Sequence, residues 1–166
     1  MASLIKELID TLEEQNNIYQ SLLDIASKKK VSIIENDIST LQQFIKQENL
    51  LVGKNQKLEK KRIEIFNDMS MVLGKSNDLS LKDIIDTING QEGHKELTLI
   101  REKIIDVLPK LKTINDQNQE LIKMSMDYID FSINVIRGAG GNSPTYYDLS
   151  GNEINLSDKK MFDAKQ

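Results

Sequence analysis

Ile34-Glu35-Asn36-Asp37-Ile38 is a short polar break between two long periodic stretches, and it predicts that the chain reverses direction there. Apolar residues recur every three or four positions before this break and every seven positions after it, as on the buried face of a helix. Asn36 or Asp37 can accept a hydrogen bond from the first free amides of the second helix. A connection this short makes the two helices antiparallel neighbours. We therefore predict helices over about residues 2–34 and 38–73.

Each of these helices has a narrow apolar seam. The first seam comprises Ile5, Leu8, Leu12, Tyr19, Leu22, Ala26 and Ile33, and the second comprises Phe44, Leu51, Leu58, Ile65 and Val72. Gln15 and Lys29 interrupt the first seam, and the line beside the second is polar at its centre, at Glu48, Asn55 and Arg62. Narrow seams are typical of a coiled coil of two or three helices. At 1.5 Å per residue, each helix would be on the order of 50 Å long, so we expect an elongated molecule.

Two further helices follow. The polar residues 74–78 end the second helix, and Ser80 with Asp83 forms a near relative of the capping box, which predicts a short helix from Leu81 to about residue 89. The last helix is predicted over about residues 94–137, with a kink or a break at Pro109. The fold class is therefore all-α, an antiparallel bundle of three long helices and one short helix over residues 1–137.

The chain changes character after the last helix, which stops at Gly138-Ala139-Gly140-Gly141. Residues 138–166 contain few apolar side chains, so we expect a flexible tail that is disordered when alone. Its local signal is a turn sequence over residues 148–152, between Tyr146-Tyr147 and Ile154 or Leu156.

Composition excludes several classes of protein. The net charge of the 166 residues is −4, with interleaved signs, which argues against a nucleic-acid protein. Cysteine is absent, so the fold needs no disulfide and no oxidising compartment. The N-terminus lacks an unbroken apolar segment, and no stretch approaches the eighteen or so apolar residues that span a bilayer. We expect a soluble, unexported protein that is not inserted into a membrane.

No pattern predicts catalysis. The one histidine, His94, has no second histidine or cysteine with which to share a metal. The carboxylate pairs Glu13-Glu14 and Asp127 with Asp130 lack the glutamate-x-x-histidine motif of di-metal bundles. Phosphate-loop, dinucleotide and nucleophile-elbow motifs are also absent from the sequence. We predict no catalytic residue, no cofactor and no metal.

The end of the last helix is apolar on more than one face. Ten of the residues from Leu121 to Ile136 are large and apolar or aromatic: Leu121, Ile122, Met124, Met126, Tyr128, Ile129, Phe131, Ile133, Val135 and Ile136. Two explanations fit this excess. The helix could be sandwiched between the first two helices, or it could offer a surface to another protein. Tyr146 and Tyr147 carry the same two alternatives, packing on the bundle or grasping a partner.

The layout resembles that of the FlgN-type flagellar export chaperones. The resemblance rests on the break at residues 34–38, a long second helix, and three motifs further along the chain. These are Asn115-Asp116-Gln117-Asn118-Gln119-Glu120-Leu121-Ile122, Tyr128-Ile129-Asp130-Phe131-Ser132 and Thr145-Tyr146-Tyr147-Asp148-Leu149-Ser150-Gly151. The last is similar to the Thr-Tyr-Asp-x-x-Gly tail motif of the family, here with a doubled tyrosine.

The resemblance implies a cytoplasmic, non-enzymatic chaperone of the flagellar type III export system. Such a chaperone binds the terminal helices of the hook-filament junction proteins, blocks premature assembly and delivers its clients to the export gate. The residues expected to bind the client are Leu121, Ile122, Met124, Tyr128, Ile129, Phe131 and Ile136. The tail positions expected to dock are Tyr146, Tyr147, Asp148 and Gly151. The alternative is a structural coiled-coil adaptor that self-associates or bridges partners, and the sequence does not distinguish a monomer from a homo-oligomer.

Overall fold

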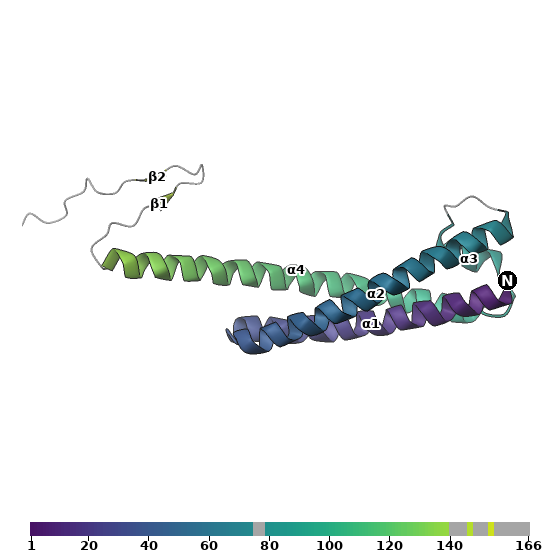
Figure 1. Ribbon diagram of the computed structural model, residues 1–166, viewed down its shortest axis with the longest axis horizontal. Coiled ribbons are helices and arrows are strands. Elements are labelled where there is room, and N and C mark those ends of the chain that lie inside the picture. Colours follow the sequence, from purple (N-terminus) through teal and green to yellow (C-terminus); the bar gives the residue numbers. More distant parts are fainter. Residues whose placement is uncertain (75–78, 140–145, 148–152, 155–166) are drawn as a thin grey trace, which may run out of the picture. The chain divides into compact units, whose positions relative to one another are not determined.

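The structure is a computed structural model that describes residues 1–74, 79–139, 146–147 and 153–154. Its helices are α1 (Ala2–Ile34), α2 (Ile38–Leu73), α3 (Leu81–Thr87) and α4 (His94–Ala139) (Figure 1). The strands β1 (Tyr146–Tyr147) and β2 (Glu153–Ile154) pair antiparallel. The chain divides into two units, residues 1–121 and 122–166. The prediction of an all-α fold with three long helices and one short helix is confirmed.

The reversal between α1 and α2 is built as the sequence predicts. The Asp37 carboxylate caps α2 by accepting a hydrogen bond from the backbone N–H of Thr40 at 3.0 Å. Asn36 takes a left-handed conformation with φ of 55°, which asparagine tolerates better than most residues. The Asp37 N–H donates to the carbonyl of Ser32 at 2.9 Å and closes the turn. α1 and α2 then pack against each other as antiparallel neighbours.

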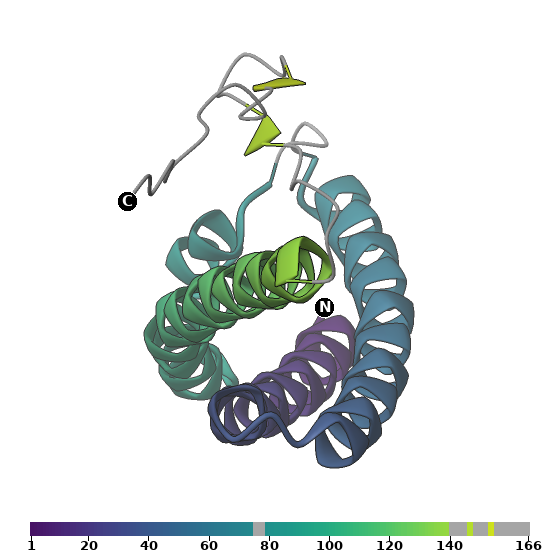
Figure 2. The same cartoon turned by 90° about the vertical axis from the view of Figure 1, so that its left-hand side faces the viewer.

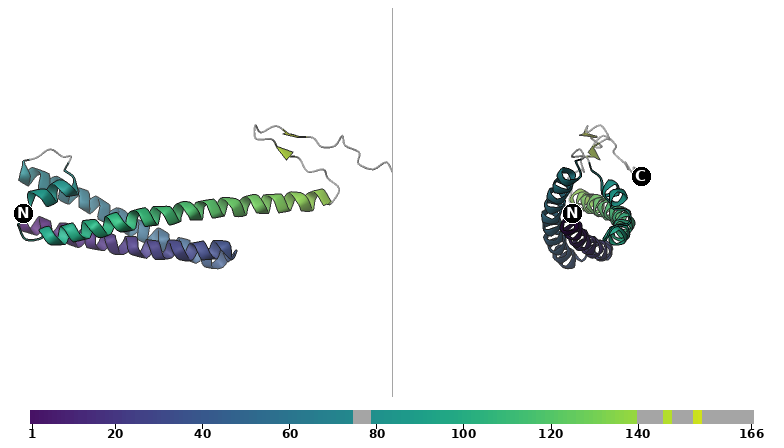
Figure 3. Two further views of the ribbon diagram at one scale, coloured as in Figure 1. Left: turned by 180° about the vertical axis from the view of Figure 1, so that it is seen from behind. Right: turned by 90° about the vertical axis from the view of Figure 1, so that its right-hand side faces the viewer.

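The main core lies where α1 begins and α2 ends, and α3 and the start of α4 complete it (Figure 3). Its buried residues are Ile5, Leu8, Leu12, Ile65, Met69, Ile84, Ile85, Ile88, Leu97 and Ile100. Each fully buried side chain of this kind contributes about 1.5–3 kcal/mol relative to an exposed one. α3 is held at this end by the predicted capping box, because Ser80 and Asp83 cap each other's backbone amides. The core therefore draws on four helices at this end and is thicker than a simple coiled coil.

The polar side chains that interrupt the apolar seam of α1 contact polar side chains beside the seam of α2. Gln15 is fully buried, and its amide nitrogen donates to Glu59 Oε2 at 3.1 Å and to Asn55 Oδ1 at 3.5 Å. Lys29 forms an ion pair with Glu48, with 2.7 Å between Nζ and Oε2. Matched polar groups in an otherwise apolar seam penalise any sliding of one helix along the other, so they specify the register.

The first part of α4 packs along α1. The Asn118 side-chain amide is buried and donates to the carbonyl of Ala26 at 2.8 Å. Lys30 Nζ donates to Gln117 Oε1 at 2.9 Å. Within residues 1–121, α1 therefore lies between α2 and the first part of α4 (Figure 2).

Two details of the helices differ from the sequence-based expectations. Of the kink or break expected at Pro109, a break is absent, since α4 runs without interruption from His94 to Ala139. Pro109 and Ile105 are both exposed, so water can reach the Ile105 carbonyl that proline leaves without a helical donor. Val72 is 56% exposed instead of buried, and Met69 lies in the core. A helix has 3.6 residues per turn, so positions seven apart drift around the helix axis by about 20° per heptad. By the end of α2 this drift turns Val72 out of the core and brings Met69, seven residues after Arg62, into it.

Candidate functional site

The exposed apolar side chains of residues 122–136 form two stripes on α4. The isoleucine stripe comprises Ile122, Met126, Ile129, Ile133 and Ile136, and the aromatic stripe comprises Met124, Tyr128, Phe131 and Val135. Within each stripe the spacing is three or four residues, which keeps its members on one side of a helix. The stripes are two residues out of step. At 100° per residue this places them on roughly opposite sides of the helix.

All nine side chains are exposed, from 37% at Ile122 to 72% at Ile136. Tyr128 is 71% exposed and Phe131 61% exposed, although aromatic side chains of this size are usually at least partly buried in a core. A contiguous exposed apolar surface on a helix is typical of a site where another protein binds. Residues 122–136 therefore offer apolar surface on two sides.

The structure places six of the seven residues expected to bind the client on these stripes. Ile122, Ile129 and Ile136 belong to the isoleucine stripe. Met124, Tyr128 and Phe131 belong to the aromatic stripe. Leu121 is half-buried and belongs to the unit of residues 1–121.

Three members of the two stripes were not among the residues predicted to bind the client: Met126, Ile133 and Val135. Each of them lies three or four positions from a residue that was predicted to bind, and this spacing identifies it as part of the same stripe. Polar side chains separate the stripes along both flanks. They include Asp127, Asp130 and Asn134 on one flank and Ser125 and Ser132 on the other.

The tail residues are described only in part. The backbone of Tyr146 pairs with that of Ile154, and the backbone of Tyr147 pairs with that of Glu153. This pairing brackets the predicted turn over residues 148–152, although strands were not predicted. Asp148 and Gly151 lie outside the described residues. The expectation of a disordered tail concerns mostly residues that the structure does not describe.

Nothing in the described residues forms a metal site or a membrane span. No three histidine, aspartate or glutamate side chains among them gather into a group that could hold a metal ion. His94 begins α4, where its backbone carbonyl accepts a hydrogen bond from the Thr98 hydroxyl at 2.8 Å. Across residues 1–74 and 79–139, no helix is long and apolar enough to cross a membrane.

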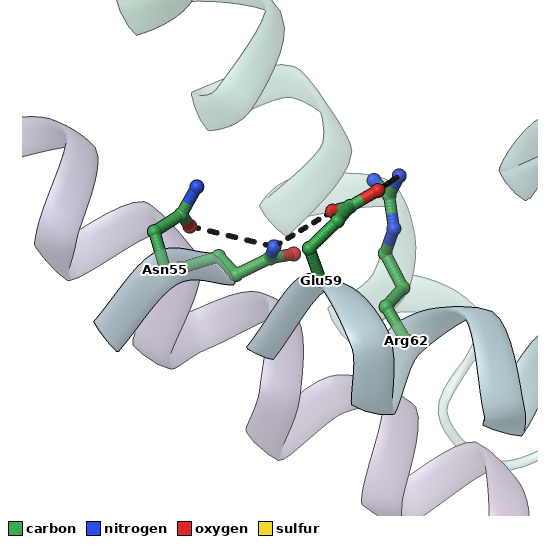
Figure 4. Close-up of polar contacts among 4 residues, drawn as sticks. Asn55, Glu59 and Arg62 are labelled. Atoms are coloured by element: carbon green, nitrogen blue, oxygen red, sulfur yellow. Dashed lines mark hydrogen bonds and ion pairs between the residues drawn. The ribbon is translucent and has the colours of Figure 1, made fainter. Parts of the chain in front are cut away.

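Polar side chains also gather in the first unit, on the side of α2 near residue 59. Glu59 accepts a hydrogen bond from Gln15 through one carboxylate oxygen and forms an ion pair with Arg62 through the other (Figure 4). The Arg62 guanidinium lies 5.7 Å from the centre of the Phe66 ring, close enough for a cation–π contact. Gln15 Oε1 is buried and has no hydrogen-bond partner among the described residues. None of these side chains was predicted from the sequence to form a site.

Comparison with known proteins identifies the family. The family model described as FlgN protein matches residues 1–153, which covers all four helices, β1 and the first residue of β2. The chain belongs to the FlgN family. FlgN proteins are flagellar export chaperones and not enzymes, so the resemblance that the sequence motifs indicate is confirmed.

A curated relative aligns with nearly the whole chain. The chain is 22% identical over 160 residues to a protein of Bacillus subtilis (strain 168) described as uncharacterized protein YvyG. The match covers 96% of this chain and 98% of the relative. No solved structure gives a significant match to the chain.

Proposed function

We propose that the protein is a cytoplasmic chaperone that binds the terminal helices of hook-filament junction proteins. It keeps these clients from assembling early and delivers them to the flagellar export gate. The observation that carries the proposal is the pair of exposed stripes on residues 122–136 of a chain that belongs to the FlgN family. A helix with exposed apolar side chains every three or four residues is the pattern that a second amphipathic helix recognises.

The stripes also explain how such a complex would prevent premature assembly. Terminal helices that pair with one another in an assembled filament expose an apolar face before assembly. If that face packs against Tyr128, Phe131 or Ile129, it is no longer available to another client molecule. Large aromatic side chains are common anchors at protein interfaces because each buries much surface with few rotatable bonds.

The tail is assigned a separate role after client binding. By the motif match, Tyr147, Asp148 and Gly151 dock on the export machinery or clamp the complex, and Tyr146 assists. This assignment rests on the resemblance of residues 145–151 to the family's tail motif. It predicts that a chain truncated after Ala139 still binds the client but no longer supports its export.

The test is a binding titration with the terminal segments of a junction protein, combined with light scattering to establish a 1:1 complex. Tyr128→Ala and Phe131→Asp should each weaken binding at least tenfold, equivalent to about 1.4 kcal/mol. Helical content should not change, because both side chains are exposed. Leu99→Asp is the matched control, since Leu99 is a 53% exposed apolar residue of the same helix. Client binding that survives both variants would remove the aromatic stripe from the proposed site.

A structural coiled-coil adaptor is the second candidate function. The stripe spacing that suits a client helix also suits a second copy of the chain. This candidate predicts a stable homo-oligomer in the absence of any client, and it predicts that truncation after Ala139 changes little. Size-exclusion chromatography with light scattering, repeated over a range of protein concentrations, separates the two functions.

A further inference from the structure

An open cleft lies on the other unit, within residues 1–121, and shares no residue with the two stripes. It has a volume of about 900 Å³ and is formed by α1, α2 and α4. Its lining residues are Tyr19, Gly53, Asn55, Gln56, Lys57, Glu59, Lys60, Arg62 and Leu108. The α2 wall runs from Gly53 to Arg62, which is about two and a half helical turns, or roughly 14 Å.

Gly53 lines this cleft, and nothing within the chain requires a glycine at this position. It lies in the middle of α2, where a glycine costs about 0.5–1 kcal/mol relative to alanine. Its φ is not positive, and a Cβ added at this position would meet no atom within 4 Å. Neither the backbone conformation nor the packing of α2 therefore requires glycine. The missing side chain leaves a notch in the α2 wall of the cleft.

The side chains that line the cleft carry more positive than negative charge. The lining includes three cations, Lys57, Lys60 and Arg62, and a single carboxylate, that of Glu59, on a chain whose net charge is −4. Glu59 is already held by Arg62 and by the Gln15 amide. Lys57 and Lys60 form no ion pair within the described part of the chain. Two cationic side chains are thus left beside the notch.

We propose that this cleft docks an amphipathic α-helix of a partner protein that carries aspartate or glutamate beside its apolar stripe. One apolar side chain of that helix enters the notch at Gly53, and others pack on Tyr19 and Leu108. Leu108 is 41% exposed and therefore available for such packing. The partner's carboxylates lie against Lys57 and Lys60, and this complementarity selects an acidic helix over a basic one. The cleft is a second interaction surface in addition to the client site of residues 122–136.

Two fluorescent peptides of about five helical turns provide the probe. Both carry leucine at every third or fourth position, and the flanking positions carry glutamate in one peptide and lysine in the other. Fluorescence anisotropy with the full chain should show the acidic peptide binding at least about tenfold more tightly than its basic twin. Gly53→Met fills the notch and should weaken the acidic peptide by about tenfold or more. Lys60→Glu should also weaken it, and a Lys103→Glu control of equal charge change on α4 should not.

Folding is checked separately, because filling the notch must not unfold α2. Gly53→Met should leave the thermal unfolding midpoint unchanged or raised, since nothing lies within 4 Å of the new Cβ. If Gly53→Met does not fold, Lys60→Glu alone decides the question. Equal binding of the two peptides, or acidic-peptide binding that is insensitive to these variants, would overturn the proposal. Self-association that Gly53→Met abolishes would instead identify the occupant as a second copy and would overturn it as well.

Discussion

Lys29 of α1 and Glu48 of α2 form an ion pair across the seam of the two helices, 2.7 Å apart and only 12% and 22% exposed. Lys28, the neighbour of Lys29, forms a pair of the same length with Asp24, but that pair lies within one helix and is 56% and 61% exposed. The two pairs therefore differ in burial and not in length. A partly buried charge that loses its partner stays desolvated, whereas an exposed one is hydrated.

Lys29→Ala should lower the free energy of unfolding by about 1–3 kcal/mol, because it leaves the Glu48 carboxylate partly buried and unpaired. Lys28→Ala should change it by less than about 0.5 kcal/mol. Replacing Lys29 and Glu48 together by leucine should restore most of the loss, since no unpaired charge then remains. Urea denaturation followed by circular dichroism measures all three. Equal effects of Lys29→Ala and Lys28→Ala would show that the seam pair contributes no more than a surface pair.

The cap of α2 should make stability depend on pH in the acid range. Hydrogen bonds from the Thr40 side chain and backbone hold the pKa of the Asp37 carboxyl below its ordinary value. A carboxyl with a lowered folded-state pKa stabilises the fold fully above its unfolded-state pKa, and this stabilisation is lost as pH falls through the folded-state pKa. The unfolding midpoint of Asp37→Ala should thus lie below that of the unmodified chain at pH 7. The difference should shrink as the pH falls below about 4.

Asp37→Asn separates the charge from the hydrogen bond, because asparagine also caps a helix. We expect this variant to show a smaller loss at pH 7 than Asp37→Ala and to have a flatter dependence on pH. Thermal melts between pH 7 and pH 3 measure both curves. A gap between Asp37→Ala and the unmodified chain that stays constant down to pH 3 would show that the carboxylate charge does not contribute.

Two glycines before α4 should respond differently to alanine. Gly90 and Gly93 both have a positive φ, 77° and 88°. A Cβ at Gly90 would meet open space, but one at Gly93 would lie 2.5 Å from Ile5 Cγ2 in the core. Gly90→Ala should cost about 1–2 kcal/mol from backbone strain alone. Gly93→Ala should cost about 2–4 kcal/mol, because the overpacking adds to that strain. Equal losses in urea denaturation would rule out the close approach to Ile5.

Local signals explain why the helix boundaries were predictable. α1 and α2 begin and end where the sequence predicts, because the cap at Asp37 and the break at Gly74 act on neighbouring residues. The capping box of Ser80 and Asp83 is equally local. Pro109 shows the limit of such rules, since the cost of an interior proline depends on whether water reaches the carbonyl it frees.

Long-range features were visible in the sequence only as irregularities. Gln15 and Lys29 interrupt one seam, and Glu48 and Asn55 lie beside the other, but periodicity does not say which of them meet. Their pairing depends on the register of two antiparallel helices, which is set by the whole contact between α1 and α2. The charged cleft at Gly53 escaped prediction for a similar reason. Its walls come from three helices, so no single stretch of the sequence indicates it.

The double stripe raises the question of how many client helices bind. A helix that is apolar on two sides fits burial in a core as well as binding to a partner, so the sequence left both alternatives open. All nine stripe residues are exposed in the structure. Because the isoleucine and aromatic stripes lie on roughly opposite sides of α4, a single client helix can cover only one of them.

If both terminal helices of a junction protein bind, substitutions on either stripe should weaken the complex. We expect Ile129→Asp and Phe131→Asp each to weaken client binding at least about tenfold in calorimetric titrations. The two residues are 54% and 61% exposed, so the helical content of the free protein should stay unchanged in both variants. Leu99→Asp again serves as the control. A client segment containing one terminal helix should be sensitive to only one variant, because it occupies one stripe. Sensitivity of the full client to only one variant would show that one stripe is left free in the complex.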